Sequence, residues 1–198
     1  MGYEAMVIGD QDLQLGADVL RQRIAEAEFP VLSANVTLAG KDELLAQPYT
    51  FVEVAGRAVG IIGITWDATD LAQDQFVLLK ADEVLAKYVA EVAEKADIII
   101  VLSNMGHEDD LRLASDVPGI DLIVGGRTQI PLPQALRDPR STTLVVQAGG
   151  TGQYLGRRTL QIDPSGTVTN YTDELLLLTD EYADDSDMRQ FLDSYKVE

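Results

Sequence analysis

The stretch VLSNMGHEDDLRLASDVPGIDLIVGGRTQI, residues 101–130, decides the fold prediction for this chain. The runs DIIIVLS (97–103) and DLIVGG (121–126) are continuously apolar, which is typical of parallel strands buried on both faces. Between them, EDDLRLAS (108–115) predicts a short helix whose acidic residues fall in its first turn, where the helix dipole favours them. The stretch therefore predicts two neighbouring strands joined by a helix, each strand ending in a small polar loop.

Alternating strands and helices extend upstream of this unit, and hairpins follow it. The apolar runs predict strands at 5–9, 30–36, 49–56, 57–66, 142–150, 154–163 and 168–178, and the amphipathic runs predict helices at 17–29, 82–96 and 184–196. Trp66 ends one apolar run, so we expect it in the core. We expect a single α/β domain over residues 1–198, with a mixed sheet or two packed sheets.

The composition excludes several classes of protein. The chain has 198 residues, of which 46% are apolar, which is ample for a substantial core. Its net charge of -18 disfavours binding to nucleic acid and to anionic membranes. The absence of cysteine excludes disulfides, zinc-thiolate sites and thiol nucleophiles. There is no apolar run long enough to span a bilayer, so we expect no membrane insertion.

Four polar loops follow predicted strands and are the places where chemistry is expected. They are GDQD (9–12), SNMGH (103–107), GGRTQ (125–129) and QAGG (147–150). In α/β folds, ligands bind at the carboxyl ends of the strands, which is where these loops lie. The second loop carries the only histidine of the chain, His107.

Structural interpretations are favoured for most of the candidate residues. His107 precedes an acidic helix, so a surface or capping role is favoured over a catalytic one. Asp12 is expected to cap a turn. The glycine pairs 125–126 and 149–150 fit tight turns, because neither belongs to a P-loop pattern. The acidic run 180–187 lacks the Gly and distal Glu of an EF-hand loop, so a solvated helix cap is favoured over a calcium site.

Taken together, these stretches resemble the calcineurin-like metallophosphoesterase domain of the bacterial 5′-nucleotidase family. The matching segments are 1–36 with the family's Gly-Asn-His-Glu/Asp region, 56–69 with its central hairpin, 98–130 with its Leu-Ser-His and Gly-Gly-His-Ser-His loops, and 144–163 with its closing strands. The resemblance implies a two-sheet α/β/β/α sandwich. It also implies that the family's first strands, its Asp-x-His motif and its bridging Asp would precede Met1, and that its C-terminal domain would follow Glu198.

The chain departs from the family at the residues that carry the chemistry. By resemblance, Asp10 and Gln11 stand at the family's Asn-His pair, Asn104 at the Leu-Ser-His histidine, and Arg127 and Gln129 at the last two histidines. The family uses two divalent metal ions, and such a site needs several anionic or imidazole ligands. Here the set is one carboxylate, amides and a permanently charged guanidinium. We therefore expect no catalytic residue and no metal cofactor.

Three hypotheses for function follow from the resemblance and these departures. The leading one is a degenerate, non-catalytic domain that acts as a binding or structural module of a larger assembly. The second is a metal-dependent phosphoesterase of the 5′-nucleotidase type, completed by residues outside this chain. The third is a small-anion binder that uses Arg127. An extracytoplasmic location is implied by the resemblance alone.

Two expectations concern specific contacts. A guanidinium can compensate a buried carboxylate in place of a metal ion, so we expect an ion pair between Asp10 and Arg127; the alternative is that Arg127 points into solvent and water fills the pocket. The apolar strand Ala5–Gly9 should leave an unpaired edge, which invites pairing. We expect that edge to be covered by a second copy, a different subunit or a local rearrangement.

Overall fold

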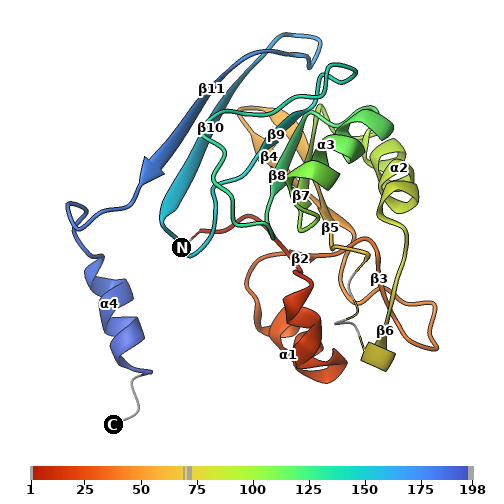
Figure 1. Cartoon of the computed structure of the whole chain (residues 1–198), viewed down its shortest axis with the longest axis vertical. Coiled ribbons are helices and arrows are strands. Elements are labelled where there is room, and N and C mark those ends of the chain that lie inside the picture. The colour runs from red at the N-terminus through yellow and green to blue at the C-terminus, as the bar shows by residue number, and fades with distance from the viewer. Residues whose placement is uncertain (1, 69, 71–72, 196–198) are drawn as a thin grey trace.

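A computed structural model describes residues 2–68, 70 and 73–195 of the chain. Its centre is a five-stranded sheet in the order β4-β5-β7-β8-β9 (Figure 1). The strands are β4 (Tyr49–Val54), β5 (Arg57–Ile64), β7 (Ile98–Ser103), β8 (Leu122–Gly125) and β9 (Leu144–Val146). β4 runs antiparallel to β5, and the other neighbours are parallel. The parallel strands β7 and β8 lie side by side, as the apolar runs of the sequence predict.

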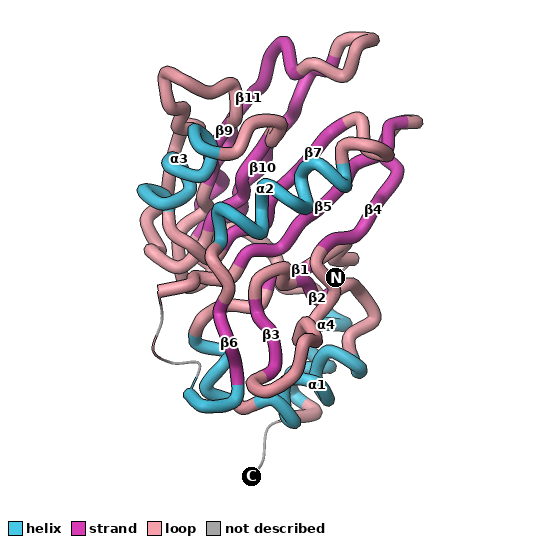
Figure 2. Tube along the Cα trace, turned by 90° about the vertical axis from the view of Figure 1, so that its right-hand side faces the viewer, coloured by secondary structure: helices cyan, strands magenta, loops and turns pink. Residues whose placement is uncertain are grey.

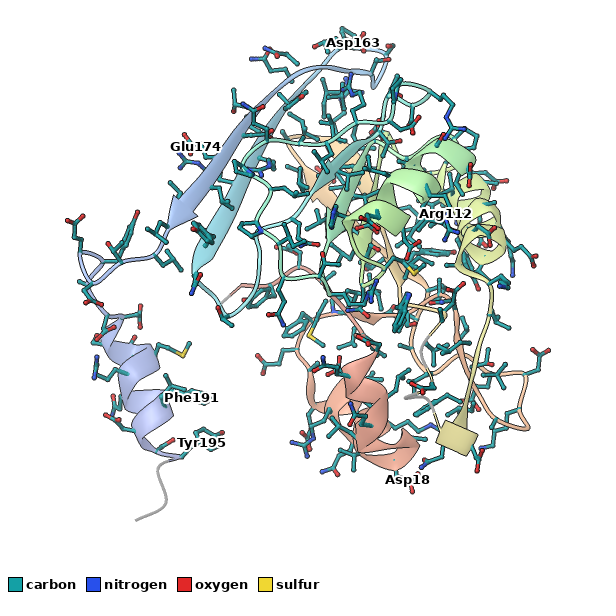
Figure 3. The ribbon with its side chains drawn as sticks, viewed as in Figure 1. Asp18, Arg112, Asp163, Glu174, Phe191 and Tyr195 are labelled. Atoms are coloured by element: carbon teal, nitrogen blue, oxygen red, sulfur yellow. The ribbon has the colours of Figure 1, made fainter. Side chains whose placement is uncertain are left out.

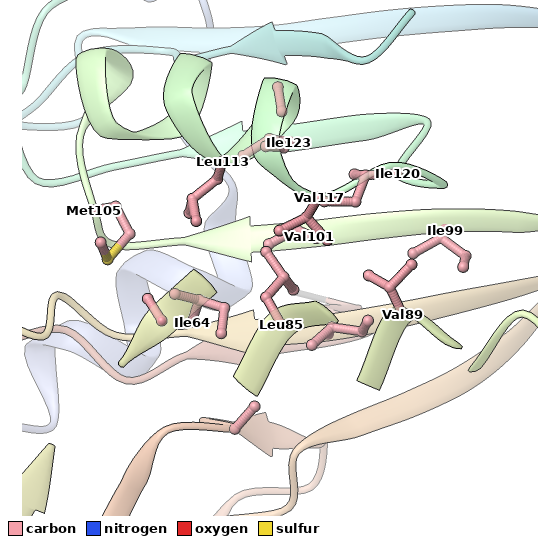
Figure 4. Packing of buried hydrophobic residues seen from close by; sticks show 14 of the residues in the cluster. Ile64, Leu85, Val89, Ile99, Val101, Met105, Leu113, Val117, Ile120 and Ile123 are labelled. Carbon is pink, nitrogen blue, oxygen red and sulfur yellow. The ribbon is translucent and has the colours of Figure 1, made fainter. Parts of the chain in front are cut away.

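Two helices cover one face of this sheet. They are α2 (Ala81–Val92) and α3 (His107–Asp116). Leu85 and Val89 of α2 and Leu113 of α3 pack against Val101 and Ile123 of the sheet (Figure 4). These side chains are at most 5% exposed, so this layer forms the main hydrophobic core.

A long hairpin covers the opposite face. It consists of β10 (Tyr154–Ile162) and β11 (Val168–Leu177), which pair antiparallel. Leu160 and Tyr171 pack onto the cluster of Leu122, Leu144 and Val146. The described part of the chain is thus layered as helices, central sheet and hairpin, with the hairpin's other face towards solvent (Figure 1).

The N-terminal segments form a smaller unit below the central sheet (Figure 2). β1 (Met6–Val7) pairs in parallel with β2 (Val31–Leu32), and β3 (Val36–Leu38) pairs antiparallel with β6 (Phe76–Leu78). Short 3-10 turns, η1 (Gln11–Leu15) and η2 (Gln73–Gln75), and the helix α1 (Ala17–Glu26) complete this unit. Its own buried cluster includes Ile8, Leu13, Leu20, Val36 and Phe76.

The last helix, α4 (Ser186–Asp193), stands away from the body of the molecule (Figure 1). Its start is capped by Asp185, whose carboxylate accepts a hydrogen bond from the Met188 backbone N–H at 2.8 Å. This confirms a capped helix within 184–196, although Lys196 lies outside the described residues. None of the helices in the described ranges combines the length and the apolar character that crossing a membrane would require.

The mixed α/β architecture predicted from the sequence is confirmed, and three predicted strands are corrected to shorter ones. The predicted strand 30–36 is only two residues long as β2, because the buried polar residues Ser33 and Asn35 turn to bond elsewhere: the amide of Asn35 donates to the Thr65 carbonyl at 2.7 Å. The predicted strand 142–150 is reduced to Leu144–Val146. The predicted strand 5–9 is reduced to Met6–Val7, because the chain turns at Gly9 and Asp10 into the 3-10 turn that begins at Gln11. The finer four-layer sandwich stays a prediction.

Candidate functional site

Loops from three separate strands meet in one polar hollow. The loop after β1, the loop after β7 and the loop after β8 together enclose about 220 Å³, lined by Gly9, Asp10, Gln11, Asp12, Asn104, Arg127 and Gln129. β7 and β8 are parallel neighbours, so their carboxyl ends open at the same edge of the sheet. The structure therefore brings together all five candidate residues of the sequence: Asp10, Gln11, Asn104, Arg127 and Gln129.

Short hydrogen bonds hold the first loop against the second. The backbone N–H of Asp10 donates to the Asn104 side-chain oxygen at 2.8 Å. The N–H of Gly9 donates to the Asp12 carboxylate at 2.8 Å, which confirms that Asp12 closes a turn. A Cβ at Gly9 would stand 3.3 Å from the Asn104 amide nitrogen, so the two loops are packed closely. The side-chain oxygen of Asn104 therefore already accepts a hydrogen bond from the protein backbone.

The expected ion pair between Asp10 and Arg127 is wrong. The guanidinium carbon of Arg127 lies 4.1 Å from the centre of the Trp66 ring, and its Nε donates to the Met105 carbonyl at 2.7 Å. No ion pair joins Arg127 to a carboxylate within the described residues. The physical reason is that the guanidinium already has two other partners, because it stacks on an aromatic ring and donates to a backbone carbonyl. Trp66, expected only in the core, is half-buried and acts as the platform for Arg127.

The third loop has a strained backbone at two residues that line the hollow, Arg127 and Gln129. Arg127 has φ 67° and Gln129 has φ 56°, which is the left-handed region that non-glycine residues rarely adopt. Such strain persists only where the surroundings fix it. The terminal nitrogens of the Arg127 guanidinium have no hydrogen-bond partner in the part of the chain that the structure describes. Arg127 thus lines the hollow with donors left over on its guanidinium.

A fully buried carboxylate lies beneath this loop, and no sequence pattern predicts it. Asp110 of α3 is 0% exposed and accepts a hydrogen bond from the Ser103 hydroxyl at 2.5 Å. Its second oxygen has no hydrogen-bond partner among the described residues. Burial raises the pKa of Asp110 to about 7, against the lowering effect of the Ser103 hydrogen bond. Gly125 is required here, because a Cβ would stand 2.4 Å from that second oxygen.

His107 belongs to a neighbouring network of side-chain hydrogen bonds. Its Nδ1 lies 3.2 Å from the Thr128 hydroxyl, which in turn accepts a hydrogen bond from the Gln147 amide at 3.0 Å. The same amide also donates to the Ile130 carbonyl at 2.6 Å. His107 is the first residue of α3, so this network ties the start of that helix to the third loop. The structural interpretation of His107 fits this position.

The residues at the hollow do not fit the two metal ions that the resemblance implies. The lining groups that could face an ion are the carboxylates of Asp10 and Asp12, the amides of three side chains and the cation of Arg127. Asp12 is already bonded to the Gly9 N–H. Within residues 2–68, 70 and 73–195 there is no group of three or more His, Cys, Asp or Glu residues arranged to hold a metal. We therefore derive no metal-dependent step from this site.

Comparisons with known proteins place the chain beside phosphoesterases. No protein-family model matches it. It is 30% identical to the trifunctional nucleotide phosphoesterase protein YfkN of Bacillus subtilis, over 100% of this chain and 16% of that protein. It is 29% identical to a snake venom 5′-nucleotidase of Gloydius brevicauda, over 100% of this chain and 38% of that protein.

A solved structure gives the same relationship. The 5′-nucleotidase precursor of Thermus thermophilus superposes with a TM-score of 0.87 at 31% identity, covering 98% of this chain and 42% of that chain. The chain thus spans well under half the length of these relatives. The chain is related over nearly its whole length to one part of the 5′-nucleotidases, and its mixed α/β structure resembles that part.

Proposed function

We propose that this chain is a degenerate, non-catalytic relative of the metallophosphoesterase domain of the 5′-nucleotidases, acting as a binding or structural module of a larger assembly. The observation that carries this proposal is the position of Arg127. Arg127 lines the hollow at the position that the resemblance assigns to a histidine ligand. It is held there by Trp66 and by the Met105 carbonyl.

The electrostatics of the hollow support the proposal. A guanidinium stays protonated at every working pH, so it repels a divalent cation at short range. The amides of Gln11, Asn104 and Gln129 are neutral and much weaker ligands for transition metals than imidazole. A bound hydroxide nucleophile needs a metal that lowers the pKa of its water. The set of side chains at the hollow is unsuited to that task.

A phosphatase assay with added Mn²⁺ tests the proposal against the alternative of a surviving phosphoesterase completed by residues outside this chain. The purified chain should hydrolyse neither p-nitrophenyl phosphate nor a nucleoside monophosphate above the buffer rate. A matched control is the variant with Asn104→His, Arg127→His and Gln129→His, which restores three imidazoles and should gain Mn²⁺ affinity. Metal-dependent turnover by the unaltered chain, abolished by Asp10→Ala, would overturn the proposal.

A second candidate function, small-anion binding, is favoured by one specific observation. Arg127 lines the hollow, and its terminal nitrogens have no hydrogen-bond partner among the described residues. An oxyanion could accept two parallel hydrogen bonds from such a fork. Phosphate or sulfate should then raise the melting temperature of the chain in a saturable manner, and Arg127→Met should abolish the effect. Equal stabilisation of both proteins would indicate a general salt effect only.

Location and association belong to the same proposal. The relative from Gloydius brevicauda is named as a venom protein, which supports an extracytoplasmic location for this chain. β1 pairs with β2 on one edge, and Met6 in β1 is 42% exposed, which supports association with a protein partner or a second copy through the strand Ala5–Gly9. In that assembly we propose the four-layer α/β/β/α arrangement of the family.

A further inference from the structure

An apolar groove lies beside β1, at the edge of the N-terminal unit. Eight of its lining residues are apolar: Met6, Ile8, Leu15, Leu20, Ile24, Ala27, Phe29 and Val31. Only Asp12 and Arg23 are polar. The groove has a volume of about 270 Å³, and Leu15 in its wall is 54% exposed. An open groove of this composition is of the kind that receives the apolar face of a helix.

Helix α4 presents a matching ridge. Met188, Phe191, Leu192 and Tyr195 follow one another at spacings of three, one and three residues, which places them on one side of the helix and its final turn. Phe191 is 55% exposed, Leu192 57% and Tyr195 69%. The rings of Phe191 and Tyr195 meet edge to face with centroids 5.1 Å apart, so they form one surface. Within the described chain, no residue of α4 is buried.

The ridge and the groove belong to the same end of the molecule. Figures 1 and 2 place α4 beside the end that carries α1. Phe191 and Tyr195 point from α4 towards the side on which α1 lies (Figure 3). The connecting segment begins at Leu178, whose N–H donates to the Gln153 carbonyl at 2.8 Å, and all of its residues to Asp185 are exposed. This segment includes a turn in which the Tyr182 N–H donates to the Thr179 carbonyl at 3.1 Å, so the helix is joined to the hairpin by an exposed connection.

We propose that the α4 ridge of one copy docks into the groove between β1 and α1 of a second copy. Within the described residues, each chain carries both halves of the contact and leaves both exposed, so two copies can satisfy each other in a closed, twofold dimer. The proposal rests on the association proposed above at Ala5–Gly9 and specifies what binds there, since Met6 and Ile8 line the groove. It does not depend on whether the polar hollow binds metal or anion.

The area available is sufficient for a stable dimer. Two aromatic residues, a leucine and a methionine remove roughly 400 Å² of helix surface from water, given the area that aromatic side chains commonly bury. The groove contributes a similar area, and the exchange happens twice. The total of roughly 1,600 Å² is the standard size of a specific protein interface. An isolated single docking would be only half as large.

Sedimentation velocity of the full chain between about 1 and 100 µM is the first test. The unaltered chain should show a dimer that dissociates on dilution. Phe191→Asp on the ridge and Leu15→Asp in the groove should each give monomers, because both side chains are exposed in the single chain and neither change should unfold it. Matched controls are Gln190→Asp on α4 and Val19→Asp on α1, which lie outside ridge and groove and should leave the dimer intact.

Sedimentation velocity of a mixture of the Phe191→Asp and Leu15→Asp variants is the decisive experiment. The Phe191→Asp chain keeps an intact groove and the Leu15→Asp chain keeps an intact ridge, so an equimolar mixture should recover heterodimers through one docking contact. No recovery would mean that α4 pairs with α4 or that association occurs elsewhere, and either result overturns the proposal. A chain that is monomeric at every concentration overturns it as well.

Cross-linking distinguishes exchange between copies from docking within one chain. The chain has no cysteine, so Leu15→Cys with Phe191→Cys introduces the only two thiols. A short bismaleimide should join them between chains and give a covalent dimer on a denaturing gel. A monomer cross-linked within itself would show that α4 closes onto its own groove, contrary to the proposal. Circular dichroism melting of each variant verifies that it is folded.

Discussion

The guanidinium of Arg127 lies over the indole ring of Trp66, 4.1 Å from its centroid, and forms no ion pair with Asp10. A cation over an aromatic face contributes about 0.5–2 kcal/mol, depending on how far it is desolvated. The hydrogen bond from Arg127 Nε to the Met105 carbonyl adds to this. The site is thus stabilised by contacts that involve no ion and no carboxylate.

A double-mutant cycle between Trp66 and Arg127 should therefore show coupling. Trp66→Leu and Arg127→Met should each lower the free energy of unfolding, and the double variant should lose about 0.5–2 kcal/mol less than the sum of the two. The matched cycle between Asp10→Asn and Arg127→Met should show no coupling beyond the usual error. Urea unfolding at neutral pH measures both cycles. Coupling at Asp10 and none at Trp66 would restore the ion-pair hypothesis.

The buried carboxyl of Asp110 should make stability depend on pH. Its pKa is raised to about 7 in the folded chain, above the value of about 3.9 for an unfolded Asp. The folded state therefore binds more protons between these values. The stabilisation is complete below about pH 4 and is lost as the pH rises through about 7, by an amount on the order of a few kcal/mol.

Asp110→Asn is the variant that checks this dependence. The difference in free energy of unfolding between the variant and the unaltered chain should shift in favour of the variant from pH 4 to pH 7 and then stay constant. Asp109→Asn is a second check, because the charge of Asp109 helps to raise the pKa of Asp110, so its removal should move the loss of stability to lower pH. A difference for Asp110→Asn that does not change with pH would show that the pKa of Asp110 is not raised.

A buried ion pair within the hairpin joins β10 to β11. Arg158 and Asp173 lie opposite each other on β10 and β11, with a nitrogen-oxygen distance of 3.0 Å and both side chains 9% exposed. Asp173 also accepts the Ala135 N–H at 2.6 Å, and Arg158 donates to the Leu132 carbonyl at 3.1 Å. Removing one partner leaves a buried charge, so Asp173→Ala should cost about 3–5 kcal/mol.

The next pair along the same hairpin is the control for that prediction. Arg157 and Glu174 face solvent, with side chains 65% and 46% exposed. Exposed pairs contribute about 0–1 kcal/mol, so Glu174→Ala should hardly change the free energy of unfolding. Thermal or urea melts of the two variants give the comparison. Equal losses at Asp173 and Glu174 would mean that the ion pair is not buried in solution.

The left-handed backbone of Gln129 gives a prediction of the opposite sign. Its φ is 56° and its side chain is exposed. Glycine adopts this conformation without the steric cost of about 1–2 kcal/mol that other residues meet. Gln129→Gly should therefore leave stability unchanged or raise it by up to about 1 kcal/mol, after the entropy cost of glycine is subtracted. A clear destabilisation would show that the Gln129 side chain contributes a contact of its own.

The sequence predicts the central strands well because their side chains obey a simple rule. Residues 98–103 and 122–125 lie inside the central sheet and are mostly buried or half-buried, so they are nearly uninterrupted apolar runs, and both are strands in the structure. The antiparallel pair of Val36–Leu38 with Phe76–Leu78 was missed, because each segment has only three residues and no periodicity. Such pairing depends on the path of the chain and not on local pattern.

At the candidate site, too, the sequence predicts which residues come together but not which contacts they make. Strand ends can be read from the sequence, so Asp10, Asn104, Arg127 and Gln129 were expected together, and the structure places them around one hollow. Their contacts could not be read in the same way. The platform under Arg127 comes from Trp66, sixty-one residues earlier in the chain. An arginine between a carboxylate and an aromatic face has two good partners, and only the tertiary structure selects one.

The metal content of the purified chain tests the central claim most directly. The chain is incubated with Mn²⁺ or Zn²⁺, separated from free metal by gel filtration and analysed by mass spectrometry of the elements. Because Arg127 and three amides line the hollow in place of imidazoles, the account predicts no stoichiometric metal, well below one ion per chain. One or two tightly held ions per chain, lost on Asp10→Ala, would contradict it.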